Sequence, residues 1–282
     1  MKVIQTVKEM QAWSMSQHKK GYKTGFVPTM GYFHPGHLSL MKSSIKRTDK
    51  TVVSIFVNPT QFGVNEDFSK YPRNYERDLE LAKEAGVDMV FLPAVDEIYP
   101  EGYDTYVVTD KLSQVLEGKT RPTHFRGVCT IVLKLLNIVM PDILFMGQKD
   151  IQQCVVLSRM IQDLHLKVKM VIQPTIREKD GLAMSSRNTY LSLEERKAAL
   201  VLSQALEYAK NQVEKGTSNT AFIVNGMKKL INNESLADLD YIAVVNRYSL
   251  LPVKKLEGSF IICLAVYIGK TRLIDNYLFD VG

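Results

Sequence analysis

The first part of the chain alternates short apolar runs with segments of helical periodicity, and this alternation restricts the fold more than any other feature. The clearest run is TVVSIFVN at 51–58, which is almost entirely apolar and β-branched. A run of this kind is typical of a strand that is buried on both faces of a sheet. Strands separated by helices pair in parallel through right-handed crossovers. The sequence therefore predicts an α/β domain with a Rossmann-like parallel sheet.

The other elements of this domain are expected at regular intervals. Strands are predicted at 24–28, 51–58, 87–93, 142–147 and 167–174, and helices at 37–46, 75–85, 126–140 and 150–160.

The pattern changes after Pro174. Ser192, with Glu195 three residues later, forms a predicted capping box for one long helix that Gly216 ends. Helices followed by strands indicate a small α+β domain. We place the boundary at residue 175, which gives domains 1–175 and 176–282. The later elements are a helix at 217–230 and strands at 239–245, 259–268 and 272–279.

Composition and charge narrow the class of protein. Hydrophobic residues make up 45% of the chain and charged residues 23%, as in ordinary globular proteins. The net charge of +6 is not gathered in a basic arm, so we expect no nucleic-acid partner. Residues 1–13 lack the apolar core of a secretory signal, and the most apolar stretch, 128–140, is too short to span a bilayer. We therefore expect a cytoplasmic protein with no membrane partner.

The cysteines point to the same compartment. Cys129, Cys154 and Cys263 each lie in an apolar run, and their spacing matches no metal motif. We expect buried free thiols in a reducing environment.

The motif PTMGYFHPGH, at 28–37, joins the first strand of the alternating series to the helix that follows. Ligands of parallel sheets bind at the carboxyl ends of strands, and helix N-termini attract phosphate. Pro35 fits the first helical position, and Gly36 would let a phosphate approach the backbone. His34 and His37, three residues apart, would share one face and donate to phosphate oxygens. Metal ligation and a purely structural role are the alternatives, although no nearby Cys or acidic residue completes a metal set.

Three further segments carry polar side chains that suit a nucleotide site. Lys149 and Asp150 open a helix after a predicted strand, with Gln153 one turn later. Asn58 and Gln61 follow another strand and could hydrogen-bond a neutral hydroxyl group. The segment GLAMSSRN, at 181–188, places small hydroxyls beside an arginine and suits a polyphosphate clamp. Each segment taken alone also fits an ordinary turn or helix start.

The motifs PTMGYFHPGH, SIFVNPTQF, RPTHFRGV, FMGQKDIQQ and GLAMSSRNTYL, in this order, resemble those of pantothenate synthetases. That family belongs to the HIGH-motif nucleotidyltransferase superfamily, and MSSRN stands in the position of its KMSKS-type loop. The resemblance covers almost the whole chain. Three places depart from the family pattern. In the first motif, Tyr32-Phe33 and Pro35 replace smaller or acidic residues. Thr123 replaces the usual glycine of RPGHF, and Arg77-Asp78 stands where an acidic pair is expected.

The resemblance implies an enzyme that condenses (R)-pantoate with β-alanine, using ATP and a pantoyl-adenylate intermediate, and releases AMP and pyrophosphate. It implies that Mg²⁺ accompanies ATP, with Asp78 as a candidate for the metal's outer shell, and that the protein is a homodimer. His37 would be the catalytic proton donor and His34 would bind phosphate, with Lys149 and Arg187 as further catalytic groups. Gln61 and Gln153 would hold pantoate, with Asn58 beside them and Gln61 also near β-alanine. The implied ATP-binding residues are Met30, Gly31, Tyr32, Phe33, His34, Pro35, Gly36, His37, Gly147, Gln148, Lys149, Asp150, Ile176, Met184, Ser185, Ser186 and Arg187.

Three other functions compete with this interpretation. A nucleotidyltransferase would keep the adenylate on its product, so the release of free AMP separates it from a ligase. An aminoacyl-tRNA synthetase fragment would need a tRNA-binding extension, and we expect none here. A non-catalytic nucleotide- or RNA-binding protein would have no need of both histidines, Lys149 and Arg187.

Overall fold

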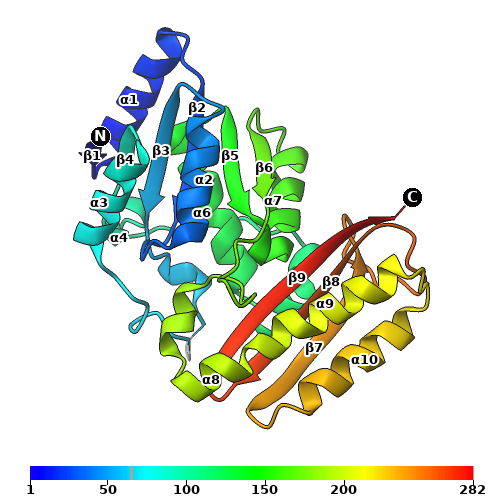
Figure 1. Cartoon of the computed structure of the whole chain (residues 1–282). Coiled ribbons are helices and arrows are strands. Elements are labelled where there is room, and N and C mark those ends of the chain that lie inside the picture. Colours follow the sequence, from blue (N-terminus) through cyan, green and yellow to red (C-terminus); the bar gives the residue numbers. More distant parts are fainter. Residues whose placement is uncertain (64–65, 282) are drawn as a thin grey trace. The chain divides into compact units, whose positions relative to one another are not determined.

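The computed structural model describes residues 1–63 and 66–281, and the chain forms two compact units (Figure 1). Unit 1 comprises Met1–Gly147 and Gln153–Pro174. Unit 2 comprises Gln148–Gln152 and Thr175–Gly282. The short segment Gln148–Gln152 therefore groups with the C-terminal unit, although the chain on both sides of it belongs to unit 1.

Unit 1 is built on a six-stranded parallel sheet, which confirms the predicted fold class. The spatial order is β1-β4-β3-β2-β5-β6. The side chains of neighbouring residues alternate between the two faces, as strand geometry requires. On one face of the sheet, Val27 of β2 and Phe145 of β5 belong to an apolar core that also contains residues of α2 and α3. The strands are β1 (Lys2–Ile4), β2 (Thr24–Thr29), β3 (Lys50–Ile55), β4 (Met89–Phe91), β5 (Ile143–Gly147) and β6 (Lys169–Gln173).

The helices of unit 1 cover this sheet (Figure 1). The most buried is α6, whose residues from Phe125 to Val139 are largely inaccessible to solvent. The helices are α1 (Val7–Lys19), α2 (Pro35–Ile45), α3 (Tyr75–Ala85), α4 (Val95–Ile98), α5 (Glu117–Thr120), α6 (His124–Val139) and α7 (Ile151–Asp163), and the 3₁₀ turns are η1 (Pro59–Gln61) and η2 (Leu112–Gln114). The 3₁₀ turn η3 (Gln148–Asp150), directly before α7, groups with unit 2, as do the first two residues of α7.

Some local expectations for unit 1 were wrong or incomplete. The strand predicted at 51–58 is shorter than the apolar run, because β3 ends at Ile55 and Asn58 caps η1. β1 and α1 were not predicted from the sequence. β1 has three residues and pairs with β4, a strand distant in sequence, so no local periodicity predicts it.

Unit 2 contains a three-stranded antiparallel sheet with helices packed on it (Figure 1). Its strands are β7 (Ala237–Asn246), β8 (Gly258–Ile268) and β9 (Thr271–Val281). Its helices are α8 (Leu193–Ala198), α9 (Leu200–Glu214) and α10 (Thr220–Asn232), preceded by the 3₁₀ turn η4 (Ser186–Tyr190). Residues such as Leu202, Ile223 and Phe260 join both layers in one apolar core. This arrangement confirms the predicted α+β class.

The start of the helical part of unit 2 follows the predicted capping box. The Glu195 N–H donates to Ser192 Oγ at 3.2 Å, and the Ser192 N–H donates to Glu195 Oε2 at 2.8 Å. The single long helix that we expected is divided at Ala199, where α8 ends and α9 begins.

The order of strands in unit 1 locates a switch in topology. From β2 the chain proceeds to β3 and β4 on one side, whereas β5 and β6 lie on the other side. In open α/β sheets, ligands bind outside the carboxyl ends of the strands at such a point. The chain leaves β2 through the 28–37 motif and leaves β5 through Gly147.

Burial agrees with the expectation for the cysteines, since Cys129, Cys154 and Cys263 are all buried thiols. Across the described residues, no helix combines the length and the hydropathy that crossing a bilayer requires.

Candidate active site

The turn after β2 has an uncommon backbone that a buried carboxylate holds. Gly31 and Tyr32 have φ angles of 82° and 52°, so two successive residues are left-handed. Residues other than glycine rarely adopt this backbone conformation. Asp78 accepts the N–H of Tyr32 at 2.6 Å and that of Phe33 at 2.7 Å. These two bonds offset the strain of the turn and fix the direction in which the chain enters α2.

Asp78 is buried, and its environment differs from that of an open metal ligand. Burial raises the pKa of its carboxyl group, while the N–H bonds from Phe33 and Tyr32 oppose that rise. Within residues 1–63 and 66–281, no three His, Cys, Asp or Glu side chains gather in a metal-binding group. The outer-shell role of Asp78 stays a prediction, and the observed contacts give it a role in shaping the turn.

His34 and His37 lie together at the N-terminus of α2. Their ring centroids are 4.0 Å apart. His34 Nδ1 accepts the Gly36 N–H at 3.1 Å, and His37 Nδ1 accepts the His34 N–H at 3.3 Å. A ring nitrogen that accepts carries no proton, so each neutral imidazole has its N–H on Nε2. The predicted proximity of the two rings is therefore observed, together with a tautomer that the sequence did not specify.

Gly36 is required by this arrangement. A Cβ atom at position 36 would lie 2.8 Å from His34 Cε1 and 2.9 Å from His34 Nδ1. Pro35 occupies the first helical position, as predicted.

A second polar group in unit 1 brings together Met30, Asn58 and Gln61. The Gln61 side-chain N–H donates to Met30 Sδ at 3.1 Å, and Asn58 Nδ2 donates to Gln61 Oε1 at 3.1 Å. Tyr99 donates to Asn58 Oδ1 at 2.8 Å. The predicted ATP residue Met30 is thus linked to two of the predicted pantoate residues. The third, Gln153, is half-buried in the first turn of α7.

The backbone of Gln61 is held by residues to which the sequence analysis gave no role. His124 Nδ1 lies 3.0 Å from the Gln61 carbonyl oxygen, and Arg121 Nη1 lies 3.3 Å from His124 Nε2. Arg121 also binds Glu66 in a two-bond ion pair, with Nε 2.8 Å from Oε1. These residues belong partly to the motif RPTHFRGV, so their signal was present in the sequence without an assigned function.

The approach of α6 to this turn depends on Gly127. A Cβ atom there would lie 2.4 Å from the Thr60 carbonyl oxygen. Thr123, at the start of α6, has φ −95° and ψ −10°, so its φ is negative and lies outside the left-handed region that favours glycine. The backbone at this position therefore does not require a glycine.

In unit 2, the predicted phosphate-binding loop is a short, internally bonded hairpin. The Met184 N–H donates to the Ile176 carbonyl at 3.0 Å, and Arg177 and Ala183 form an isolated antiparallel bridge. Gly181, with φ 99°, makes the turn. Ser185 Oγ accepts the Arg187 N–H at 3.3 Å and caps η4, in which Ser186 is buried.

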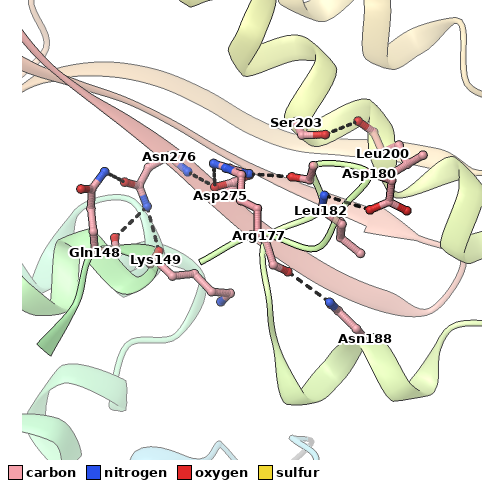
Figure 2. A network of polar contacts seen from close by, with 12 residues as sticks. Gln148, Lys149, Arg177, Asp180, Leu182, Asn188, Leu200, Ser203, Asp275 and Asn276 are labelled. Carbon is pink, nitrogen blue, oxygen red and sulfur yellow. Dashed lines mark hydrogen bonds and ion pairs between the residues drawn. The ribbon is translucent and has the colours of Figure 1, made fainter. Parts of the chain in front are cut away.

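The predicted segment after β5 lies on η3. Lys149 Nζ is 3.4 Å from Asp150 Oδ1, with side chains 21% and 51% exposed. The Lys149 side chain is therefore partly exposed on η3. The carbonyl groups of Gln148 and Lys149 are bound by Asn276 of β9 (Figure 2). Asn276 was not predicted as a site residue, because nothing near position 276 resembles a motif.

His124 generates a test of stability against pH. Burial, reinforced by the Arg121 charge, lowers the pKa of His124 from 6.5 to about 4. Between pH 6.5 and about 4, His124 is therefore protonated in the unfolded chain but not in the folded protein. The free energy of unfolding should decrease as the pH falls from 6.5 towards 4. Urea denaturation at pH 7 and pH 5 should show a smaller loss for His124→Gln than for the wild type. The exposed His18 provides a control, since His18→Gln should behave like the wild type, and an equal loss in all three proteins would contradict the assignment.

Comparisons with known proteins identify the family. The pantoate-beta-alanine ligase family model matches residues 2–278. The chain is 51% identical over 281 residues to the pantothenate synthetase of Heliobacterium modesticaldum, with 100% of both chains covered. It is 50% identical over 280 residues to that of Caldicellulosiruptor bescii, with 99% of each covered.

Solved structures give the same result. A pantothenate synthetase crystal structure from Thermus thermophilus matches with a TM-score of 0.94 and 42% identity, and 98% of this chain and 99% of that chain are covered. A pantoate-beta-alanine ligase from Francisella tularensis, complexed with beta-gamma ATP and beta-alanine, matches with a TM-score of 0.81 and 35% identity over 99% and 97% of the two chains. The chain therefore belongs to the pantoate–β-alanine ligase family of enzymes, which form pantothenate, as the motifs of its sequence predicted.

Proposed function

We propose that this enzyme condenses (R)-pantoate with β-alanine in an ATP-dependent reaction that passes through a pantoyl-adenylate and releases AMP and pyrophosphate. The observation that carries the proposal is the pair of imidazoles, His34 and His37, at the N-terminus of α2. They follow the strand at which the sheet order switches, where parallel sheets bind ligands. The ATP and β-alanine named in the Francisella complex support the same pair of substrates here.

The first step needs positioning and charge stabilisation more than acid–base chemistry. A pantoate carboxylate is ionised at neutral pH and needs no general base. Its oxygen attacks the α-phosphorus of ATP, the bond to the bridging oxygen breaks, and pyrophosphate leaves with the electron pair. Negative charge increases on the phosphoryl oxygens and the leaving group. His37 would donate from Nε2, since its Nδ1 accepts a backbone N–H, and His34, Lys149, Ser185 and Arg187 would supply further donors and positive charge.

The second step uses the activated acid. The neutral amine of β-alanine attacks the carbonyl carbon of the mixed anhydride, AMP leaves, and the nitrogen loses a proton as the amide forms. Gln61 and Gln153, with Asn58, would hold pantoate through hydrogen bonds to its hydroxyl and carboxyl groups. The contacts of Asn58 with Gln61 and Tyr99 pre-organise this part of the site.

Mg²⁺ would enter with the nucleotide. It is usually held by substrate phosphates and one or two carboxylates. Both Asp78 oxygens already accept backbone N–H groups, so this carboxylate would reach a metal ion through a water molecule. The cation would screen the phosphate charge of ATP. The homodimeric state rests on the family resemblance, and the cytoplasmic location rests on the composition of the sequence. Both stay predictions.

The proposed reaction is tested by isotope exchange. With ATP and pantoate but no β-alanine, labelled pyrophosphate should exchange into ATP, because the adenylate forms before the amine is needed. Addition of β-alanine should release free AMP and pantothenate, which mass spectrometry identifies. Exchange only with all three substrates would favour a concerted route. Protein that becomes covalently labelled by isotopic pantoate would indicate an acyl-enzyme, and an adenylylated final product would indicate a nucleotidyltransferase. Each of these results contradicts the proposal.

His37 can be examined with three substitutions. His37→Ala should reduce pyrophosphate exchange by about 10²–10³-fold, the cost of one lost transition-state donor. His37→Asn keeps an acceptor near the position of Nδ1 and should be equally impaired, whereas His37→Gln extends an amide towards the position of Nε2 and should recover part of the rate. Thermal unfolding checks that the fold is retained. A near-wild-type rate in His37→Asn would remove the donor role.

Gln61 should affect pantoate more than ATP. Gln61→Ala removes a neutral hydrogen-bonding group from the proposed acid pocket, so we expect an increase of about tenfold or more in the KM for pantoate, the scale of one good hydrogen bond. The KM for ATP should change much less. Steady-state kinetics with each substrate varied in turn gives both values. Equal increases would reassign Gln61 to the general architecture of the site.

A further inference from the structure

Asn276 lies on β9, far along the chain from every motif, yet its side chain holds the backbone that carries Lys149. Asn276 Nδ2 donates to the Gln148 carbonyl at 3.0 Å and to the Lys149 carbonyl at 2.8 Å (Figure 2). Asn276 Oδ1 lies 3.4 Å from Gln148 Nε2. The Asn276 side chain is therefore occupied at both N–H groups and at its oxygen, and the residue is only 2% exposed.

The chemistry of this contact requires an amide. Two carbonyl oxygens that face one side chain need two donors on one short group, which asparagine supplies and aspartate does not. Lys149 carries its charge at the end of a flexible four-carbon stem. Fixing the Lys149 peptide therefore restricts where the ammonium group can reach, because the stem then starts from a defined point.

The neighbouring residue, Asp275, holds the other predicted phosphate-binding segment. Arg177 Nη1 and Nη2 bind the Asp275 carboxylate at 2.6 and 2.9 Å, a two-bond pair with Asp275 3% exposed. Arg177 Nη1 also donates to the Gly181 carbonyl at 3.0 Å, across the hairpin that leads to Ser185 (Figure 2). The two-bond geometry fixes the plane of the guanidinium group and hence the base of the hairpin.

The two anchors are coupled to each other. The Asn276 N–H donates to Asp275 Oδ1 at 2.8 Å, so one carboxylate oxygen receives both this bond and the Arg177 contact. Gln148–Gln152 groups with unit 2 and not with the strand that precedes it. The spacing between Lys149 and the 184–187 segment is therefore set inside unit 2.

We propose that Asn276 and Asp275 are positioning residues for the nucleotide. Asn276 sets the starting point of Lys149, and Asp275, acting through Arg177, sets the hairpin that presents Met184 to Arg187. The proposal rests on the function proposed above, since it takes Lys149 and Arg187 as groups that bind the phosphates of ATP. A role in stability alone would not distinguish ATP from pantoate, so the substrates provide the test.

The experiment compares Asn276→Ala, Lys149→Ala and the double variant in the full-length enzyme. Asn276→Ala should raise the KM for ATP and lower pyrophosphate exchange by about ten- to hundredfold, the range expected when a catalytic group is misplaced by about 1 Å. The KM for pantoate should stay within about twofold of the wild type. In the Lys149→Ala background, the Asn276→Ala change should have little further effect, because the group it positions is already gone.

Asn246→Ala is the matched control. The Asn246 side chain also binds backbone in unit 2, where it accepts the N–H groups of Tyr248 and Ser249, but it contacts no predicted site residue. It should lower thermal stability without changing either KM. KM does not depend on the concentration of folded enzyme, so partial unfolding of a variant does not obscure the result. If Asn276→Ala is insoluble, Asn276→Asp keeps the volume and the acceptor and removes both donors.

The outcomes are distinct. Independent, multiplicative effects of Asn276→Ala and Lys149→Ala, or equal changes in both KM values, would overturn the positioning role while leaving the proposed function intact. No effect of Lys149→Ala on the ATP reaction would overturn the assignment of that lysine and the inference with it. The proposal is supported if Asn276→Ala lowers pyrophosphate exchange and raises the KM for ATP but not that for pantoate, and if Asn246→Ala changes none of these.

Discussion

The parallel pairing of β2 between β3 and β5 is the constraint on which the rest of unit 1 depends. It places the earlier strands on one side and the later strands on the other, so the chain leaves neighbouring strands in different directions. The residues that follow β2 then enter α2 through a turn that Asp78 stabilises. The imidazole pair at the start of α2 is a consequence of that topology and of one buried carboxylate.

Buried polar contacts, more than apolar packing, define the geometry of the candidate site. Asp78 satisfies two backbone N–H groups of the turn, and Asn276 does the same for two carbonyl groups. Leaving such groups buried and unpaired costs about 1–3 kcal/mol each, so each contact favours a single local conformation. In both cases the residue that shapes the site lies far in sequence from the motif that it supports.

The sequence predicted the fold class and the character of the motifs with few errors. Periodicity is a local property, and the apolar runs of β2, β3 and β5 were readable because each is buried on both faces. The elements that escaped notice had other causes. β1 is stabilised by pairing with β4, which is distant in sequence. The long helix after Ser192 is divided at Ala199, where no glycine or proline indicates a break. The candidate residues were readable as types, and their partners were not, because hydrogen bonds such as that from Tyr99 to Asn58 join distant positions.

The sequence by itself determined which family this chain belongs to and which side chains are available for chemistry. Those properties are carried by ordered motifs, from the two histidines to the serine–arginine loop, and need no coordinates. Only the tertiary structure decided how those side chains are held. It assigned Nε2 as the donor of both imidazoles. It also showed that Asp78 binds the backbone of the turn after β2 and that Asn276 of β9 binds the backbone of Lys149. The physical reason is that a hydrogen bond depends on distance and direction in space, and sequence separation contains neither.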